Sequence, residues 1–350
     1  MLKFKKVIAG LSAVVIAMSL AACGSDITWA SKIDGKVISP GTYIYFVSQG
    51  YTDASSKLTE QEIEGDVFDN KIDGQNAKDY IKDFASEKSK ESVAILNEFD
   101  NLGLEFSDKK ATDIEMSIES EWEQVGDTYK KLGIAESSLN YIYTMYEKQS
   151  MIFDAYYAEG GIEEVSDEEI LEKLSQDYAY IRAISVSLKN DEGEDLTDDE
   201  KAQKLEKLEA YKTRIEDGEK FIDIYDEYNK ELQGDSYTVS DEDLADEDRA
   251  KTVIDKNNQY LSSTLIDSIM SQENDTVEII KVEGAYLLVE KYDITQSESV
   301  KDNYTDTIIY SLKNDEFNEK IESWASELSI EKNEAVYDKY DPKDIHNKLS

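Results

Sequence analysis

Three stretches of the chain have the pattern of β-strands. Residues 178–188 follow the two-residue period of a half-buried β-strand, and residues 276–282 and 285–293 are two further β-rich runs. The turn between these two runs is Glu283-Gly284, which is typical of a β-hairpin. Helical patterns fill the sequence between the strands. The pattern therefore predicts a small α+β module over residues 178–294.

A hairpin followed by a helix is predicted over residues 29–49. The dipeptide Asp34-Gly35 favours a two-residue turn between short strands. Ser39 is a good N-cap and Pro40 suits the first helical position, so a helix is expected to begin there and to reach about Gln49.

Capping signals mark the further helices. Apolar residues recur at helical spacing over residues 76–99, and Ser107 predicts the start of the next helix, which is expected to end near Trp122. Ser166 and Thr197 each stand three residues before a glutamate, which is the capping-box pattern.

The C-terminal region predicts a linker and then a helix. Residues 295–303 are polar and read as the linker. The helix that follows carries an apolar stripe, including Ile308, Phe317 and Trp324, which is too hydrophobic to face water on its own. We expect this helix to pack on another part of the chain.

The first 22 residues predict a signal peptide. Three lysines precede an apolar run over residues 7–20, and two alanines precede Cys23. Residues 20–24 resemble the lipobox of bacterial lipoproteins, in which the cysteine carries fatty acyl chains such as palmitate. The alternatives are an ordinary signal peptide or a short transmembrane anchor, although the run is shorter than the ~20 residues of a spanning helix. We expect attachment through Cys23 to the extracytoplasmic face of the cell membrane.

Charge and residue types exclude several classes of function. The chain has 38 basic and 78 acidic residues and a formal charge of −40, which repels nucleic acid. The acidic runs 195–200 and 241–248 lack the spacing of a calcium loop and are expected to be solvated. Because the chain shows no Ser-His pair, reactive cysteine, zinc ligand set or phosphate-binding loop, no catalytic residue, metal or cofactor is predicted.

The module resembles the parvulin-type peptidyl-prolyl isomerases. In that family the first strand reads Arg-Ala-x-His-Ile-Leu-Val and the last strand reads Gly-Tyr-His-Ile-Ile, and the matching residues here are 182–188 and 284–288. Ser185 and Tyr286 replace the two family histidines, and the only histidine in the chain is His346. The resemblance implies a parvulin scaffold without its paired histidines, which leaves isomerase activity uncertain.

The whole chain is similar to the PrsA/SurA group of extracytoplasmic chaperones. The lipobox, the hairpin and helix that follow it and the parvulin-like module carry this resemblance. It implies an α+β protein in which a discontinuous, mostly helical chaperone domain holds an inserted parvulin-like domain. The expected boundaries are 1–22 for the signal peptide, 23–177 for the N-terminal domain, 178–294 for the insert and 295–350 for a C-terminal segment that packs back on the N-terminal domain.

Two sets of side chains are candidates for binding. The first stands where the family has its prolyl pocket, and these residues either form a remnant pocket or fill the old cavity: Ser185, Leu261, Leu265 and Tyr286. The second lies along one predicted helix, where adaptable aromatic and methionine side chains either bind clients or form helical core. Its members are Tyr141, Tyr143, Met145, Tyr146, Met151, Phe153, Tyr156 and Tyr157.

These features predict a membrane-anchored foldase or chaperone that assists the folding of secreted proteins, with prolyl isomerase activity lost. The second hypothesis is an active peptidyl-prolyl isomerase. The third is a solute-binding lipoprotein of a transporter, which requires two α/β lobes. The expected partners are unfolded or partly folded secreted proteins, the membrane, and a second copy of the chain in a homodimer.

Overall fold

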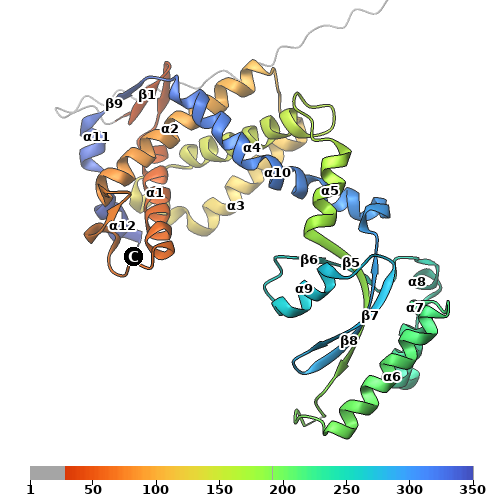
Figure 1. The fold of residues 1–350 in the computed structure, drawn as a ribbon. Helices are drawn as coiled ribbons and strands as arrows, with labels where there is room; N and C mark the ends of the chain where they lie inside the picture. Colours follow the sequence, from red (N-terminus) through yellow and green to blue (C-terminus); the bar gives the residue numbers. More distant parts are fainter. Residues whose placement is uncertain (1–27, 191, 350) are drawn as a thin grey trace, which may run out of the picture. The chain divides into compact units, whose positions relative to one another are not determined.

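The computed structural model describes residues 28–190 and 192–349 (Figure 1). The predicted signal peptide and the predicted lipid-attachment residue Cys23 lie outside the described residues. The chain forms two compact units. One unit includes the chain up to Ile152 and the C-terminal stretch from Lys320, and the other extends from Phe153 to Glu319.

The first unit is mostly helical. Its three-stranded sheet has the order β2-β1-β9, and β3 and β4 form a separate pair. Helices α4 and α10 each contribute residues to both units. The elements are β1 Ser31–Ile33, β2 Lys36–Ile38, α1 Pro40–Glu60, η1 Val67–Asp69, β3 Lys71–Ile72, β4 Gln75–Asn76, α2 Ala77–Asn101, α3 Asp108–Leu132, α4 Glu136–Tyr157, α10 Glu298–Ser326, β9 Ile330–Lys332, α11 Glu334–Lys339 and α12 Pro342–Leu349.

Residues from both ends of the chain meet in the core of the first unit. Strand β1 pairs with β9 in antiparallel register, with Lys32 opposite Glu331. The hydroxyl group of Tyr337 lies 3.1 Å from the Ser31 hydroxyl and 3.2 Å from the Ser86 hydroxyl, so one buried hydrogen-bond cluster joins the N-terminal strand, α2 and α11. Such a cluster is stabilising because a buried hydroxyl without a partner is costly.

The second unit is built on a four-stranded antiparallel sheet with the order β6-β5-β8-β7. One face of the sheet packs on α6 and α7, and the other packs on α9 (Figure 1). The elements are α5 Asp167–Asp177, β5 Tyr178–Ser187, α6 Asp198–Glu216, α7 Phe221–Gln233, η2 Gly234–Ser236, α8 Asp241–Ala245, β6 Lys251–Asp255, α9 Ser263–Ser271, β7 Thr276–Val282, β8 Ala285–Tyr292 and η3 Ile294–Gln296.

The local sequence signals explain most element ends. Asp34 and Gly35 both have positive φ in the turn between β1 and β2, as an Asp-Gly hairpin turn requires. Both predicted capping boxes form, with the Ser166 and Thr197 side chains accepting from the backbone of the third helical residue. The α+β fold class is confirmed, because the described residues form many helices together with small antiparallel sheets.

Three predicted boundaries are wrong. Helix α1 continues past Gln49 to Glu60, because Gly50 is a contact position rather than a helix end. A Cβ there would lie 3.0 Å from the Phe84 side chain on α2. Helix α3 likewise continues through Gly126 to Leu132. The polar residues predicted as a linker instead form η3 and the first turns of α10, where Val300 is buried.

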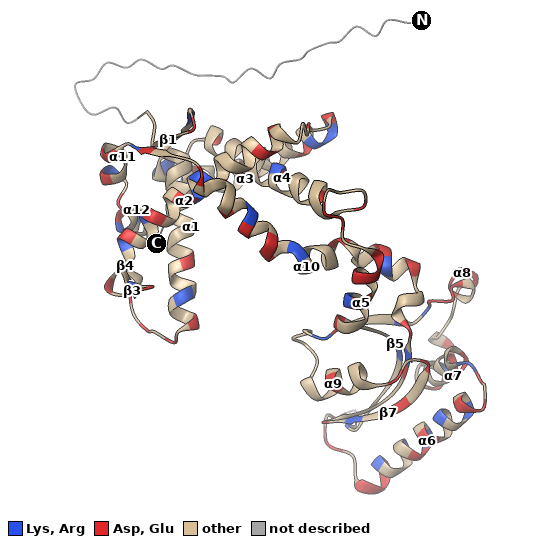
Figure 2. Ribbon diagram, turned by 45° about the horizontal axis from the view of Figure 1, so that its top comes forward, with Lys and Arg blue, Asp and Glu red and all other residues tan. Residues whose placement is uncertain are grey.

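The acidic residues are spread over both units (Figure 2). Of the two acidic runs, the first ends in the first turn of α6 and the second begins as the short helix α8. Within the described residues, no group of three or more histidine, cysteine or carboxylate side chains is placed to hold a metal ion. No helix in that part of the chain is both long enough and apolar enough to cross a membrane.

Candidate functional site

The centre of the second unit is the antiparallel pair β5 and β8. In this pair Ser185 lies opposite Leu287, and Val186 lies opposite Tyr286. Successive residues of a strand point to opposite faces of the sheet, and directly paired residues point to the same face. Val186 and Tyr286 pack with α6 and α7, so Ser185 and Leu287 belong to the face that carries α9.

The structure does not bring the four predicted pocket residues together. Leu261 and Leu265 belong to the α9 face, as does Ser185, whereas Tyr286 is on the opposite face. The side chain that faces Ser185 is Leu287, one residue further along β8. Neighbouring residues of a strand lie on opposite faces of the sheet, so a motif match that is one residue off selects Tyr286 in place of Leu287.

The α9 face is apolar and only partly covered. Leu265 and Ile269 of α9 are buried against the sheet. Partly buried apolar side chains surround them, and these are Ala183, Ile254, Leu261, Met270, Val282 and Leu287. Ser185 is exposed and adds a hydroxyl group. The face therefore combines partly buried apolar side chains with one exposed hydroxyl group.

No imidazole is available to this face. His346, the only histidine of the chain, belongs to the first unit and stacks on Tyr51 with ring centroids 3.9 Å apart. Ser185 and its paired residue Leu287 bring a hydroxyl group and an apolar side chain to this face. The proton-transfer and hydrogen-bonding chemistry of a histidine pair is therefore absent from this face.

Lys291 fixes α9 to the sheet. Its Nζ donates to the carbonyl groups of Met270 and Gln272 at the C-terminal end of α9, both at 2.8 Å. The ammonium suits this position because helix C-terminal carbonyls carry partial negative charge. Burial lowers the pKa of Lys291. The Gln272 side chain adds a bond from Nε2 to the Val289 carbonyl at 3.0 Å, so α9 is held at a defined place on β8.

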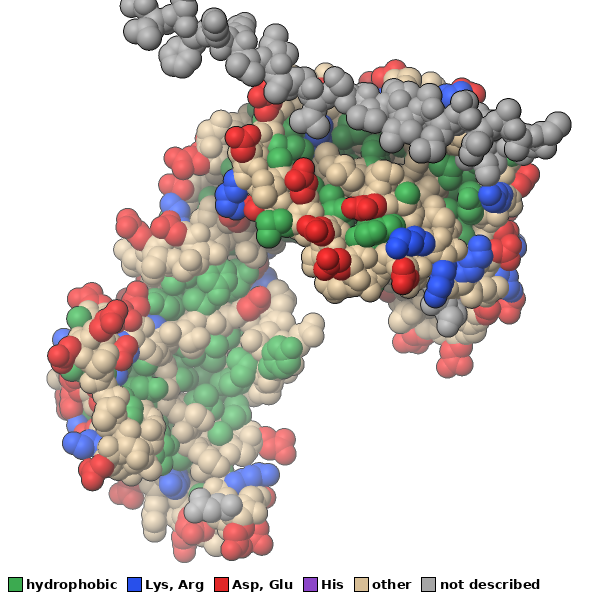
Figure 3. Space-filling model, turned by 180° about the vertical axis from the view of Figure 1, so that it is seen from behind, with side chains coloured by type: hydrophobic (Ala, Val, Ile, Leu, Met, Phe, Trp, Pro, Cys, Tyr) green, Lys and Arg blue, Asp and Glu red, His purple; other side chains and the backbone are tan. Residues whose placement is uncertain are grey.

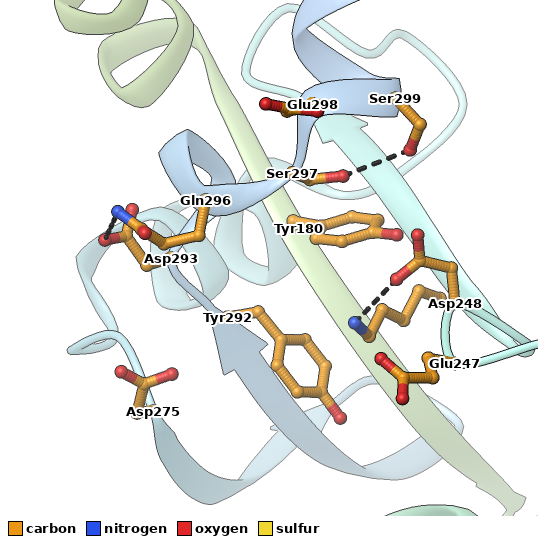
Figure 4. A pocket seen from close by; sticks show the side chains of 11 residues that line it. Tyr180, Glu247, Asp248, Asp275, Tyr292, Asp293, Gln296, Ser297, Glu298 and Ser299 are labelled. Atoms are coloured by element: carbon orange, nitrogen blue, oxygen red, sulfur yellow. Dashed lines mark hydrogen bonds and ion pairs between the residues drawn. The ribbon is translucent and has the colours of Figure 1, made fainter.

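A cavity of about 890 Å³ opens beside the sheet at the start of α10 (Figure 4). Tyr180 and Tyr292 form part of its wall, with Asp275 on one side and Asp248 on the other. The Lys251 ammonium lies 5.1 Å and 4.5 Å from the centres of the two tyrosine rings and 2.8 Å from Asp248. The protein's own cation therefore already occupies the aromatic wall.

Arg182 supports the same cavity from behind the tyrosines. Its guanidinium donates to the carbonyl groups of Glu247 and Arg249 at 2.6 Å and 2.9 Å, and to the Tyr292 hydroxyl at 2.9 Å. Burial, with a smaller contribution from Asp248, raises the pKa of Tyr180 to about 12. The motif residue Arg182 thus orders the turn before β6, and the sequence did not predict this cavity.

The predicted cluster on α4 divides between core and surface. Met145, Phe153 and Tyr157 are buried, whereas 43% of Tyr146 is exposed. In the second unit, Phe153 packs edge-on against Phe317 with ring centroids 5.2 Å apart. The remaining members, Tyr141, Tyr143, Met151 and Tyr156, are half-buried. These positions do not make one continuous binding surface.

The exposed part of α4 borders a groove against α3 in the first unit. The groove has a volume of about 720 Å³ and is lined by Met116, Ser117, Ser120, Glu121, Gln124, Val125, Tyr129 and Tyr143. Met116 is 62% exposed and Val125 is 40% exposed. Only Tyr143 of this lining was predicted. The sequence placed the end of α3 near Trp122 and so left three lining residues, Gln124, Val125 and Tyr129, outside the predicted helix.

Glu121 organises the middle of this groove. Its carboxylate accepts hydrogen bonds from the Tyr129 hydroxyl at 2.6 Å and from the Tyr143 hydroxyl. The bond to Glu121, together with burial, raises the pKa of Tyr143 to about 12. Both tyrosines therefore stay neutral at physiological pH, and the groove combines flexible apolar side chains with fixed aromatic ones.

Comparison with known proteins gave structural matches alone. No protein-family model and no curated protein matches the sequence. The solved structures similar to this chain include the foldase protein PrsA of Streptococcus pneumoniae, with 14% identity over 69% of this chain and 80% of that chain and a TM-score of 0.32.

Two further structures carry the same protein name. PrsA of Bacillus subtilis has 16% identity over 77% of this chain and 86% of that chain, with a TM-score of 0.25. The foldase protein PrsA of Lactococcus lactis has 10% identity over 89% of this chain and 98% of that chain, with a TM-score of 0.32.

Proposed function

We propose that the protein is an extracytoplasmic chaperone or foldase that assists the folding of secreted proteins and no longer isomerises prolyl bonds. The observation that carries this proposal is the α9 face, where Ser185 faces Leu287 among partly buried apolar side chains. Such a face offers contact to apolar segments but no histidine pair. The groove between α3 and α4 supplies a second adaptable surface, and hydrophobic side chains reach the surface of both units between the acidic ones (Figure 3).

A foldase must accept many unfolded segments weakly and release them. Methionine and tyrosine side chains suit such contacts because one flexes and the other offers a rigid amphipathic ring. The net charge of −40 keeps the protein soluble and favours clients that are cationic or neutral.

The proposed location is the outer face of the cell membrane, with the lipid on Cys23 as the anchor. Acyl chains contribute about 0.8 kcal/mol per buried methylene, so two or more chains hold a protein stably. A Cys23→Ser variant of the full chain should leave the membrane fraction and lose labelling by a palmitate analogue, while Ser25→Ala should do neither. Labelling of the Cys23→Ser variant would rule out this anchor.

The second candidate is an active peptidyl-prolyl isomerase. It is favoured by the position of the Ser185 hydroxyl group beside apolar side chains such as Leu287, because rotation about a prolyl bond needs no covalent step. A solute-binding lipoprotein is not favoured, because the first unit is mostly helical and carries only small sheets instead of forming an α/β lobe.

A pair of assays on the chain from residue 24 onward tests the proposal. The first measures suppression of aggregation of an unfolding client, and the second measures the slow prolyl-limited phase of a refolding protein. We expect suppression without acceleration of the slow phase. Acceleration would establish the isomerase in place of the proposed function, and no response in either assay would reject the chaperone.

A further inference from the structure

Strand β7 lies at an edge of the sheet in the second unit. It pairs with β8 on one side, and no other strand among the described residues pairs with its second side. An unpaired edge presents backbone N–H and C=O groups that can form a ladder with another extended chain. The opposite edge strand, β6, has 5 residues, whereas β7 has 7.

The hairpin geometry shows which backbone groups of β7 are free. Val282 and Ala285 flank the two-residue turn and pair with each other, and in such a turn the flanking residues exchange hydrogen bonds. Alternate residues therefore bond to β8. The remaining residues, Val277, Ile279 and Lys281, direct N–H and C=O away from β8.

These outward groups have no strand partner among the described residues. Outside the β7–β8 pair, no backbone hydrogen bond from the described residues reaches Val277, Ile279 or Lys281. A groove of about 460 Å³ extends beside them, lined by Ser268, Ser271 and Gln272 of α9 and by residues 278–281 of β7. An added strand would therefore have space for its side chains next to the edge.

The sequence of β7 favours pairing. It reads Thr-Val-Glu-Ile-Ile-Lys-Val, with neither proline nor glycine and mostly β-branched residues. Proteins commonly protect such an edge with charged side chains, a proline, a bulge or a covering element, and β7 carries only the first of these protections in its sequence. Here the exposed side chains of the strand are Glu278 and Lys281, and Glu278 forms an ion pair with Lys212 of α6 at 2.8 Å. These side chains flank the edge, while its backbone has no strand partner among the described residues.

We propose that the β7 edge binds an extended segment of an unfolded polypeptide as an additional β-strand. This inference rests on the proposed chaperone function and specifies how one surface recognises its client. Strand addition reads the backbone, so it accepts many sequences. A second copy of the chain is disfavoured as the occupant, because two molecules that each carry −40 repel one another, whereas a neutral or cationic peptide is not repelled.

The experiment measures binding of a fluorescein-labelled peptide of alternating threonine and valine with a lysine at each end, using fluorescence anisotropy and the chain from residue 24 onward. Ile279→Pro removes an outward N–H without removing a bond to β8, and proline is tolerated at such edge positions. We expect Ile279→Pro to weaken binding by about tenfold or more, because it removes a backbone bond and disturbs its neighbours.

Two matched variants separate backbone from side-chain recognition. Ile279→Val and Lys281→Ala keep every backbone group, and both should bind the peptide within about twofold of the wild type. Circular dichroism and thermal melting show whether each variant is folded. If Ile279→Pro does not fold, hydrogen exchange of the wild type decides: added peptide should slow exchange at the amides of Ile279 and Lys281.

The proposal is overturned if Ile279→Pro folds and binds the peptide as the wild type does, or if peptide leaves those amides unprotected. It is also overturned if sedimentation shows a wild-type dimer that Ile279→Pro dissociates, because a second copy then occupies the edge. Aggregation suppression distinguishes failure of strand addition from failure of the chaperone function. If the wild type suppresses aggregation but its β7 edge does not bind the peptide, strand addition alone is rejected. If the wild type does not suppress aggregation, the chaperone function is rejected.

Discussion

Ser185 on β5 lies directly opposite Leu287 on β8, and both residues are on the face of the sheet that holds α9. Tyr286, the neighbour that a motif alignment selects, packs on the other face with α6 and α7. The two faces differ in what covers them, because Tyr286 packs with α6 and α7 and Leu287 packs with α9. Substitutions at these neighbouring positions should therefore have different consequences.

The prolyl assay tests this difference. We expect the wild type, Leu287→Ala and Tyr286→Ala all to leave the slow refolding phase unchanged, because no imidazole is near Ser185. An acceleration that Leu287→Ala abolishes and Tyr286→Ala preserves would contradict the loss of activity and would locate the active face. The reverse pattern would contradict the observed register.

Lys291 should stabilise α9. Lys291→Met removes two hydrogen bonds from a charged donor to the helix end, and we expect the free energy of unfolding to fall by about 2 kcal/mol. Hydrogen exchange over residues 263–271 should become faster. The control is Lys281→Met, the same change at an exposed position on β7. Equal effects of the two variants in urea unfolding would show that the bonds to α9 contribute nothing.

Asp226 should make stability depend on pH. Arg249 donates to its carboxylate at 2.8 Å and 2.7 Å, and these bonds lower the pKa of Asp226 below its unfolded value. A lowered carboxyl pKa contributes stability above the unfolded pKa of about 3.9, and this contribution is lost as the pH falls through the folded pKa.

Thermal unfolding of Asp226→Asn between pH 7 and pH 2 measures this contribution. The variant should be less stable at pH 7, on the order of 1 kcal/mol for a partly exposed pair, and the difference should vanish at low pH. Asp235→Asn, an exposed aspartate, is the control. A difference that persists unchanged at pH 2 would assign the effect to something other than the ion pair.

The groove between α3 and α4 should contribute to client binding. Met116→Lys places a charge in an apolar lining and should weaken aggregation suppression on the order of tenfold, since the contact area of one methionine is lost. Its melting temperature should not change, because 62% of the side chain is exposed. Ile162→Lys is the matched control at another exposed apolar residue. Equal loss in both variants would reject a specific role of the groove.

Local signals in the sequence predicted the elements that short-range chemistry decides. Asp34-Gly35 and Glu283-Gly284 form the predicted hairpin turns, and Ser166 and Thr197 form the predicted capping boxes. Each of these depends on residues within a few positions of one another. The α+β module and the helices before it followed from such patterns.

Long-range contacts decided what the sequence did not predict. Gly50 appears as a helix breaker in the sequence, but it is retained in α1 because Phe84 of α2 packs against it. The pairing of Ser185 with Leu287 depends on how β8 aligns with a strand about a hundred residues earlier, and no local signal fixes that alignment. Gln124, Val125 and Tyr129 of the groove lie in the part of α3 that the sequence did not predict.

The pairing of β1 with β9 has a consequence for the order of folding. Lys32 and Glu331 are 299 residues apart, yet they are neighbours in the sheet of the first unit. A chain that crosses a membrane with its N-terminus first exposes β1 long before β9 arrives, whereas all of the second unit is contiguous in sequence. The second unit can therefore finish folding while the first is still incomplete. If the chain is secreted as we propose, it is for a time an unfolded client of the kind we propose it assists.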